Sequence, residues 1–123
     1  MRGLGELESG IMQILWRGGQ PATVREVHGE LGSKRDLAYT TVMTVMDRLW
    51  RKGLLRREPR GRAFQYIAAI SEAEFTAGLM HSLLGSSRNR KEVLAHFLKG
   101  MKKADGAQLL RLAEEAARRR RRR

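Results

Sequence analysis

The chain has 123 residues, 41% of them hydrophobic, and its 25 Lys and Arg against 13 Asp and Glu give a formal net charge of +12. A chain of this length and composition can bury one modest core with a small appended element. Because it has no cysteine, disulfides, thiolate metal sites and cysteine nucleophiles are excluded. No apolar run approaches the roughly 20 residues of a membrane-spanning helix, and no hydrophobic signal segment follows Met1, so we expect a cytoplasmic protein.

The positive charge is unevenly distributed along the chain. Residues 1–70 contain 12 basic and 7 acidic side chains, residues 71–117 contain 7 and 6, and residues 118–123 are all arginine. A positive surface of this kind attracts polyanions, either nucleic acid or an anionic membrane. The arginine run predicts a solvated, disordered tail that adds sequence-independent attraction for phosphates.

Two short helices are predicted near the N-terminus. The first lies in "GELESGIMQILWRGG"; Gly5 gives it a weak start, Gly18 and Gly19 end it, and its apolar face is Leu7, Ile11, Ile14 and Leu15. The second lies in "TVREVHGELG". There Thr23 and Glu26 have the spacing of a capping box, Gly32 ends the helix, and the apolar face is Val24, Val27 and Leu31.

The segment "LAYTTVMTVMDRLWRKGLLRRE", residues 37–58, predicts a third helix that is closed at Gly53. At helical spacing, one apolar stripe faces a core and consists of Val42, Val45, Met46 and Leu49. The opposite side carries Thr40, Thr44, Asp47 and Arg51, with Thr41 and Arg48 on one flank. Hydroxyls and arginines suit base edges and phosphates in a major groove. Taken alone, the same pattern also fits a solvated amphipathic helix.

Beyond Gly53 the sequence "LLRREPRGRAFQYIAAI" changes to an alternating pattern, which predicts a β-hairpin with its turn at residues 59–62. Three helices followed at once by a hairpin with arginines at its turn predict a mainly α fold, a winged helix-turn-helix with a two-stranded wing over residues 1–70. Order and charge together favour binding to nucleic acid. The candidate DNA contacts are Tyr39, Thr40, Thr41, Thr44, Arg48, Arg51, Arg57, Arg60 and Arg62.

Residues 71–117 predict a helical dimerisation region. Ser71 and Glu74 form a second capping box, and three short apolar-faced segments follow. About 45 residues lie near the lower limit for independent folding, so these helices need a partner. Folding back onto the winged helix is one possibility, but a homodimer is favoured because DNA sites usually repeat. The candidate dimer residues are Phe75, Leu79, Phe97, Leu98, Leu109 and Leu112.

Catalytic and metal-binding patterns are absent from the sequence. His28, His81 and His96 are isolated, with no carboxylate or second histidine at ligand spacing. No phosphate loop, nucleophile elbow or pair of catalytic carboxylates is found. We therefore expect a protein that is not an enzyme and has no cofactor, no metal and no small-molecule substrate.

The segments "LGELESGIMQILWRGGQPATVREVHGEL", "LAYTTVMTVMDRLWRKGLL" and "REPRGRAFQYIA" resemble the penicillinase-repressor family, the BlaI/MecI/CopY group of bacterial repressors. The resemblance is close from Leu4 to about Ala69 and rests mainly on helix order from Ser71 to Ala117. It implies a dimeric winged-helix repressor with its third helix in the major groove of a palindromic operator. The copper-responsive branch binds metal through cysteines, which this chain lacks, so that effector does not transfer.

The resemblance also implies a switch. A membrane-bound sensor protease that detects a β-lactam would release repression by cutting the C-terminal part. The stretch "VLAHFLKG" resembles the segment where such repressors are cut, which places the candidate cleavage site at His96 and Phe97. The alternative functions are a nucleic-acid or ribosome-associated binder that does not read sequence, and a winged helix used only for protein contacts.

Overall fold

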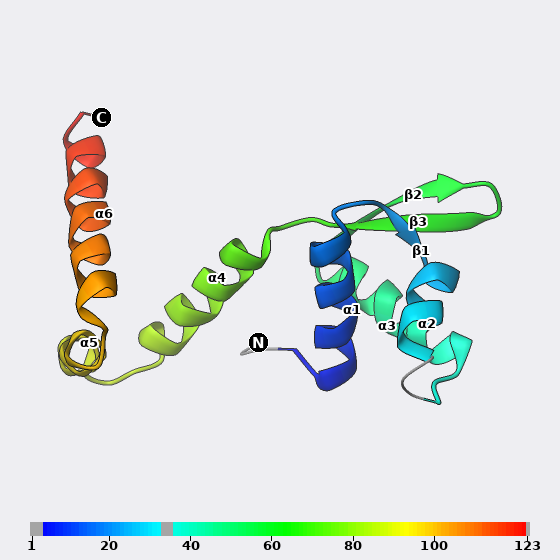
Figure 1. Cartoon of the computed structure of the whole chain (residues 1–123), viewed down its shortest axis with the longest axis horizontal. Helices are drawn as coiled ribbons and strands as arrows, with labels where there is room; N and C mark the ends of the chain where they lie inside the picture. The colour runs from blue at the N-terminus through cyan, green and yellow to red at the C-terminus, as the bar shows by residue number, and fades with distance from the viewer. Residues whose placement is uncertain (1–3, 33–35, 123) are drawn as a thin grey trace. The chain divides into compact units, whose positions relative to one another are not determined.

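The computed structural model describes residues 4–32 and 36–122. Its contacts divide the chain into two units, Met1–Ser82 and Leu83–Arg123. The elements, shown in Figure 1, are α1 (Glu6–Gly18), β1 (Ala22–Thr23), α2 (Val24–Gly32), α3 (Tyr39–Arg51), β2 (Leu55–Arg60), β3 (Ala63–Ala68), α4 (Glu72–Gly85), α5 (Arg90–Lys99) and α6 (Lys103–Arg121). No helix in the described ranges combines the length and apolar character needed to cross a bilayer.

The core of the first unit lies where the three N-terminal helices meet the sheet. The predicted stripe of α3 is buried throughout, and the predicted face of α2 is buried as well. In α1 the prediction is confirmed at Ile11 and Leu15, while Leu7 and Ile14 are partly buried against the same cluster. The remaining core residues are Met12, Leu54, Leu55 and Tyr66. The mainly helical winged helix-turn-helix is therefore confirmed.

Local hydrogen bonds set the helix boundaries. At α2 the predicted capping box is present, because the Glu26 amide donates to Thr23 Oγ1 at 3.2 Å and the Thr23 amide donates to Glu26 Oε1 at 2.8 Å. Gly5 has no side chain to cap α1, and its own amide donates to Glu8 Oε1 at 3.1 Å. Gly19 ends α1 with φ 64°, a left-handed conformation that glycine adopts without a steric penalty.

The sheet has one strand more than the sequence predicted. Its order is β1-β3-β2, with Ala22 opposite Tyr66 and Thr23 opposite Gln65. The two residues of β1 are too few to show an alternating pattern. The hairpin turn is also narrower than predicted, because Pro59 and Arg60 belong to β2, the strand at the sheet edge, where a proline is tolerated.

The first unit continues past residue 70, the boundary predicted from the sequence. The predicted capping box at α4 is present: the Glu74 amide donates to Ser71 Oγ and the Ser71 amide donates to Glu74 Oε1, both at 3.0 Å. Trp16 Nε1 donates to the Ile70 carbonyl at 3.0 Å, and the Phe75 ring lies 5.7 Å from the Trp16 ring. The start of α4 is thereby fixed to the winged helix.

In the second unit the helices are well capped but bury nothing. Asn89 Oδ1 accepts a bond from the Glu92 amide at 3.0 Å at the start of α5, and no residue of α5 or α6 in the described range is buried. The expected disorder of the arginine tail is wrong, since α6 continues through Arg121. Arginine is a good helix former, cations are favourable at a helix C-terminus, and Arg119 pairs with Glu115 at 2.7 Å.

Candidate nucleic-acid interface

One face of α3 presents hydroxyl and cationic groups to solvent. Its opposite face is buried in the core, so the helix cannot rotate without exposing apolar side chains. Tyr39 is 43% exposed at the first turn. The structure brings the other predicted α3 residues together on this exposed surface: Thr40, Thr41, Thr44, Arg48 and Arg51.

The threonine hydroxyls differ in their hydrogen bonding. Thr44 Oγ1 donates to the Thr40 carbonyl at 2.9 Å, a bond to the preceding helical turn. Its oxygen lone pairs and its methyl group stay available. A hydroxyl bonded in this way can accept a hydrogen bond from an amino group on a base edge, and its methyl can contact a thymine methyl.

Asp47 lies beside this face and pairs with two arginines. Its carboxylate accepts from Arg51 Nε at 2.8 Å and from Arg57 Nη1 at 3.2 Å. The hydrogen bond from Arg51, with a smaller contribution from Arg57, holds the pKa of this carboxyl below its ordinary value. Only the Nε of Arg51 is used, and its side chain is 72% exposed, so its terminal nitrogens remain free to contact a phosphate.

Arg57 is not placed as the sequence predicted. Its side chain is only 19% exposed, and its guanidinium carbon lies 3.5 Å from the Trp50 ring centroid and 4.1 Å from that of Phe64. The alternating strand pattern explains this position, because Arg57 shares a strand face with the buried Leu55 whereas Arg56 is exposed. These internal contacts contradict the assignment of Arg57 as a DNA contact.

The wing presents two further candidate cations. Arg62 is exposed in the two-residue turn next to Gly61, whose φ is 64°, and it has no ion pair within residues 4–32 and 36–122. Arg60 lies 3.6 Å from Glu26, with both side chains more than half exposed, and such a pair is weak enough for a phosphate to replace. Arg25 on α2 is also exposed and was not predicted. Nothing in its local sequence pattern singled it out.

The histidines have local roles. His28 Nε2 lies 2.8 Å from the Leu37 carbonyl, and its ring meets Tyr39 edge-on at 5.8 Å. His96 lies 3.9 Å from Glu92 on α5. Within the described ranges no group of three His, Cys, Asp or Glu side chains could hold a metal ion.

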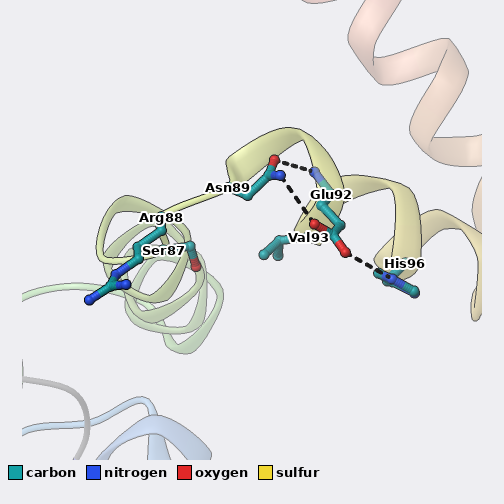
Figure 2. Close-up of a pocket in the computed structure, with 6 residues that line it drawn as sticks. All are labelled: Ser87, Arg88, Asn89, Glu92, Val93 and His96. Carbon is teal, nitrogen blue, oxygen red and sulfur yellow. Dashed lines mark hydrogen bonds and ion pairs between the residues drawn. The ribbon is translucent and has the colours of Figure 1, made fainter.

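An open pocket in the second unit adjoins the candidate cleavage site. Figure 2 shows its lining residues around the start of α5, with Asn89 and Glu92 bonded to each other and Glu92 directed to His96. Phe97 is 47% exposed, yet both cleavage-site residues lie inside α5, where the His96 carbonyl accepts from the Gly100 amide at 3.1 Å. A protease would have to open this helix before cutting it.

The predicted dimer residues fall into two groups. Phe75 is partly buried against the core of the first unit, so the structure contradicts its assignment to a free dimer surface. Leu79 is half-buried on α4. The others are exposed on α5 and α6, by between 37% and 54%: Phe97, Leu98, Leu109 and Leu112.

Known proteins share this sequence and this fold. The penicillinase repressor family model matches residues 4–116. The transcriptional regulator BlaI of Mycobacterium tuberculosis is 43% identical over 113 residues, which cover 89% of this chain and 81% of that protein. The penicillinase repressor of Bacillus licheniformis is 29% identical over 86 residues, which cover 70% of this chain and 66% of that protein.

A solved structure agrees with the winged-helix assignment. The solution structure of the DNA binding domain of the repressor BlaI matches with a TM-score of 0.53 and 27% identity, over 59% of this chain and 88% of that domain. Because the sequence match spans residues 4–116 and the winged-helix unit matches in structure as well, this chain belongs to the penicillinase repressor family.

Proposed function

We propose that this protein is a transcriptional repressor that binds a palindromic DNA operator as a homodimer. The observation that carries the proposal is the exposed face of α3, where threonine hydroxyls and arginines lie opposite a fully buried apolar stripe. Its family membership and the likeness to the DNA binding domain of the repressor BlaI support a role in DNA binding.

The residues of this face divide into two roles. Thr40, Thr41, Thr44 and Arg48 are directed toward base edges, because short hydroxyls and a free guanidinium can exchange hydrogen bonds with bases in the major groove. Arg48 has no ion pair or hydrogen bond with any side chain in the described ranges. Backbone contacts come from Tyr39, Arg51, Arg60 and Arg62.

The second unit supplies the dimer contact. Its apolar side chains would remain in water in a single chain, and burying them against the same surface of a second copy is favourable by about 25 cal/mol per Å². A single winged helix contacts only a few base pairs, so two copies at a fixed spacing bind more tightly and read a repeated site. We assign this contact to Leu79, Phe97, Leu98, Leu109 and Leu112.

Proteolysis is the proposed switch, in a response of the β-lactam type. A cut at His96 and Phe97 would separate Leu109 and Leu112 from the DNA-binding unit, so the dimer would lose part of its apolar surface. The partner would be a membrane sensor protease, and it would act when α5 opens locally. The resemblance of the sequence around His96 to the segment cut in the family supports this step.

Binding without sequence preference is the second candidate function. It is favoured by the net charge of +12 and by the consecutive arginines that continue α6. Attraction of this kind depends on phosphates alone, so it falls steeply with salt and does not distinguish one duplex from another.

The test is to select bound duplexes from a random pool and compare one selected duplex with a scrambled duplex and an RNA at fixed salt. A repressor should prefer the selected duplex by at least about a thousandfold, and the selected site should be palindromic. Equal affinity for all three would refute the repressor and support the second candidate.

Two variants test the division of roles. Thr44→Ala should lose roughly 1 to 3 kcal/mol of affinity on the selected duplex only. Arg62→Ala should weaken both duplexes similarly and lower the salt slope by about one unit, because it removes one phosphate contact. If both variants weakened the selected and scrambled duplexes equally, the assigned roles would be wrong.

A further inference from the structure

The wing and α3 are connected through one side chain, that of Arg57. Its guanidinium lies between two aromatic rings, with its central carbon 3.5 Å from the centroid of Trp50 on α3 and 4.1 Å from that of Phe64 on β3. A cation over the face of an aromatic ring is attracted by the ring quadrupole, and the planar guanidinium can stack on both rings.

The edge of the same guanidinium makes polar contacts with the same two elements. Arg57 Nη1 donates to Asp47 Oδ1 of α3 at 3.2 Å and, at the longer distance of 3.5 Å, to the Tyr66 hydroxyl of β3. Asp47 also holds Arg51, which we assign to a phosphate. One side chain of β2 therefore contacts α3 and β3 twice each, and it shares a carboxylate with a proposed DNA contact.

The outer part of the hairpin has few other attachments. The core ends at Tyr66, while Phe64 is 40% exposed and Ala63 and Arg62 are exposed. β1 pairs with β3 only at Tyr66 and Gln65. Beyond that level, the described residues offer the weak Arg60–Glu26 pair and the Arg57 contacts. A two-stranded hairpin has little stability of its own, so its angle depends on what holds it to the helix.

We infer that Arg57 is a positioning residue that fixes the angle of the wing against α3, so that the turn and the exposed face of α3 engage one DNA site together. The inference rests on the proposed function. Arg57 acts through Trp50, Phe64 and Asp47 and needs no contact with DNA. Loss of its planar stacking frees the wing, and a free wing must be ordered again on binding, which lowers affinity for the specific site most.

The chain offers a closely matched pair of variants. Arg57→Lys keeps the positive charge but removes the planar guanidinium that stacks between the rings. Arg56→Ala removes a charge from the neighbouring residue, whose exposed side chain lies on the other face of the same strand. Phe64→Leu removes one of the two rings at a position that is 40% exposed, so it disturbs the core little.

Wing position is measured without DNA. Because the chain has no cysteine, spin labels can be attached at Met43→Cys on α3 and Ala63→Cys near the hairpin turn, both exposed. The full-length labelled chain is mixed with excess unlabelled chain, so that only distances within one chain are recorded. The inference predicts a narrow distance distribution for the wild type and for Arg56→Ala, and a broad one for Arg57→Lys and Phe64→Leu.

DNA binding is measured on the selected and scrambled duplexes at fixed salt. Arg57→Lys and Phe64→Leu should lower the preference for the selected duplex by roughly tenfold, the size expected for a lost cation–π contact, with the salt slope unchanged. Arg56→Ala should leave the preference intact.

The outcomes separate the inference from the proposed function. If the wild type shows no preference for any duplex, the proposed function fails, and the distance measurement still decides whether Arg57 holds the wing. An unchanged distance distribution in Phe64→Leu and Arg57→Lys would overturn the inference. Equal weakening of both duplexes by Arg57→Lys would overturn it as well, because that result indicates a direct phosphate contact.

Discussion

The two units of the chain differ in how they treat apolar side chains. Every buried hydrophobic residue among those the structure describes lies between Ile11 and Tyr66, in the first unit. In the second unit Leu98, Leu110 and Leu112 are each more than half exposed, and α5 and α6 bury no described residue. Both units are rich in helix. The first gains its stability from a core, whereas the second has helices with no core to hold them.

Isolated helices of this length are marginal in water, because most helical stability in proteins comes from packing an apolar face. The 10 residues of α5 lie below the length at which helices are stable alone, and the 19 residues of α6 contain Gly106 and a run of like charges. This contrast supports a division in which the first unit holds the DNA-binding surface and the second is completed by another copy.

The largest expected effect comes from the core of the first unit. Leu49→Ala, at a fully buried position of α3, should lower the free energy of unfolding by about 2 to 5 kcal/mol, because it removes buried methyl groups and leaves a cavity. Leu110→Ala, at a position that is 62% exposed, should change it by less than about 0.5 kcal/mol.

Urea unfolding followed by tryptophan fluorescence measures this difference. Both tryptophans, Trp16 and Trp50, lie in the first unit, so the signal reports on that unit alone. Equal destabilisation by the two substitutions would show that the two units unfold as one body and would break the comparison.

Leu109→Asp tests the proposed role of the second unit. An unpaired carboxylate in a buried apolar contact costs several kcal/mol, so the variant should sediment as a monomer and bind the selected duplex about a hundredfold more weakly. The fluorescence-detected stability should stay unchanged. A chain that ends at Ala95 should behave in the same way.

Gln108→Asp is the matched control, because it adds the same charge at the neighbouring exposed residue and should leave the dimer intact. If Leu109→Asp remained a dimer with unchanged affinity for the selected duplex, the second unit could not couple assembly to DNA binding.

Local patterns were sufficient to predict most of the first unit. The apolar stripe of α3 and both capping boxes depend on residues within a few positions of one another, and the structure contains all of them. The exposed face of α3 was predictable for the same reason, since fixing the buried stripe also fixes which side chains face outward.

Contacts between distant segments were not predictable. β1 is two residues long and gains its meaning only by pairing with β3, more than 40 positions away. Phe75 was assigned to the dimer because no local signal revealed its contact with Trp16. Arg57 is a different case. The alternating pattern already placed it beside Leu55 on the inner face of β2, but its positive charge was given more weight than its position.

The arginine run provides a prediction of intermediate size. Because α6 continues through Arg121, these charges project from a rigid helix end. Removing residues 118–123 should lower the salt slope of binding to a scrambled duplex by up to about five units and lower that affinity roughly tenfold at low salt. The preference for the selected duplex should survive.

Replacing the six arginines with glutamine keeps the chain length and removes only the charge. Titrations of both duplexes over a series of salt concentrations measure the effect. Loss of the preference in the glutamine variant would show that the helix end takes part in sequence recognition.

The smallest expected effect concerns an ion pair between α1 and α3. Glu8 Oε2 lies 2.9 Å from Lys52 Nζ, and the Glu8 side chain is only 14% exposed. The hydrogen bond from Lys52, followed by the one from the Gly5 amide, lowers the pKa of Glu8, although partial burial opposes them. A carboxyl with a lowered pKa stabilises the folded state at pH values above its unfolded pKa, and this stabilisation is lost as the pH falls through its folded pKa.

Glu8→Gln should therefore cost about 0.5 to 1 kcal/mol of unfolding free energy at pH 7, and the difference from the wild type should shrink below about pH 4.3 and vanish near pH 3. Glu115→Gln, which removes the exposed pair with Arg119 in the second unit, should leave the tryptophan-detected stability unchanged at every pH. Urea unfolding at a series of pH values measures both. A cost of Glu8→Gln that stayed constant down to pH 3 would mean that the residue contributes through packing and not through its charge.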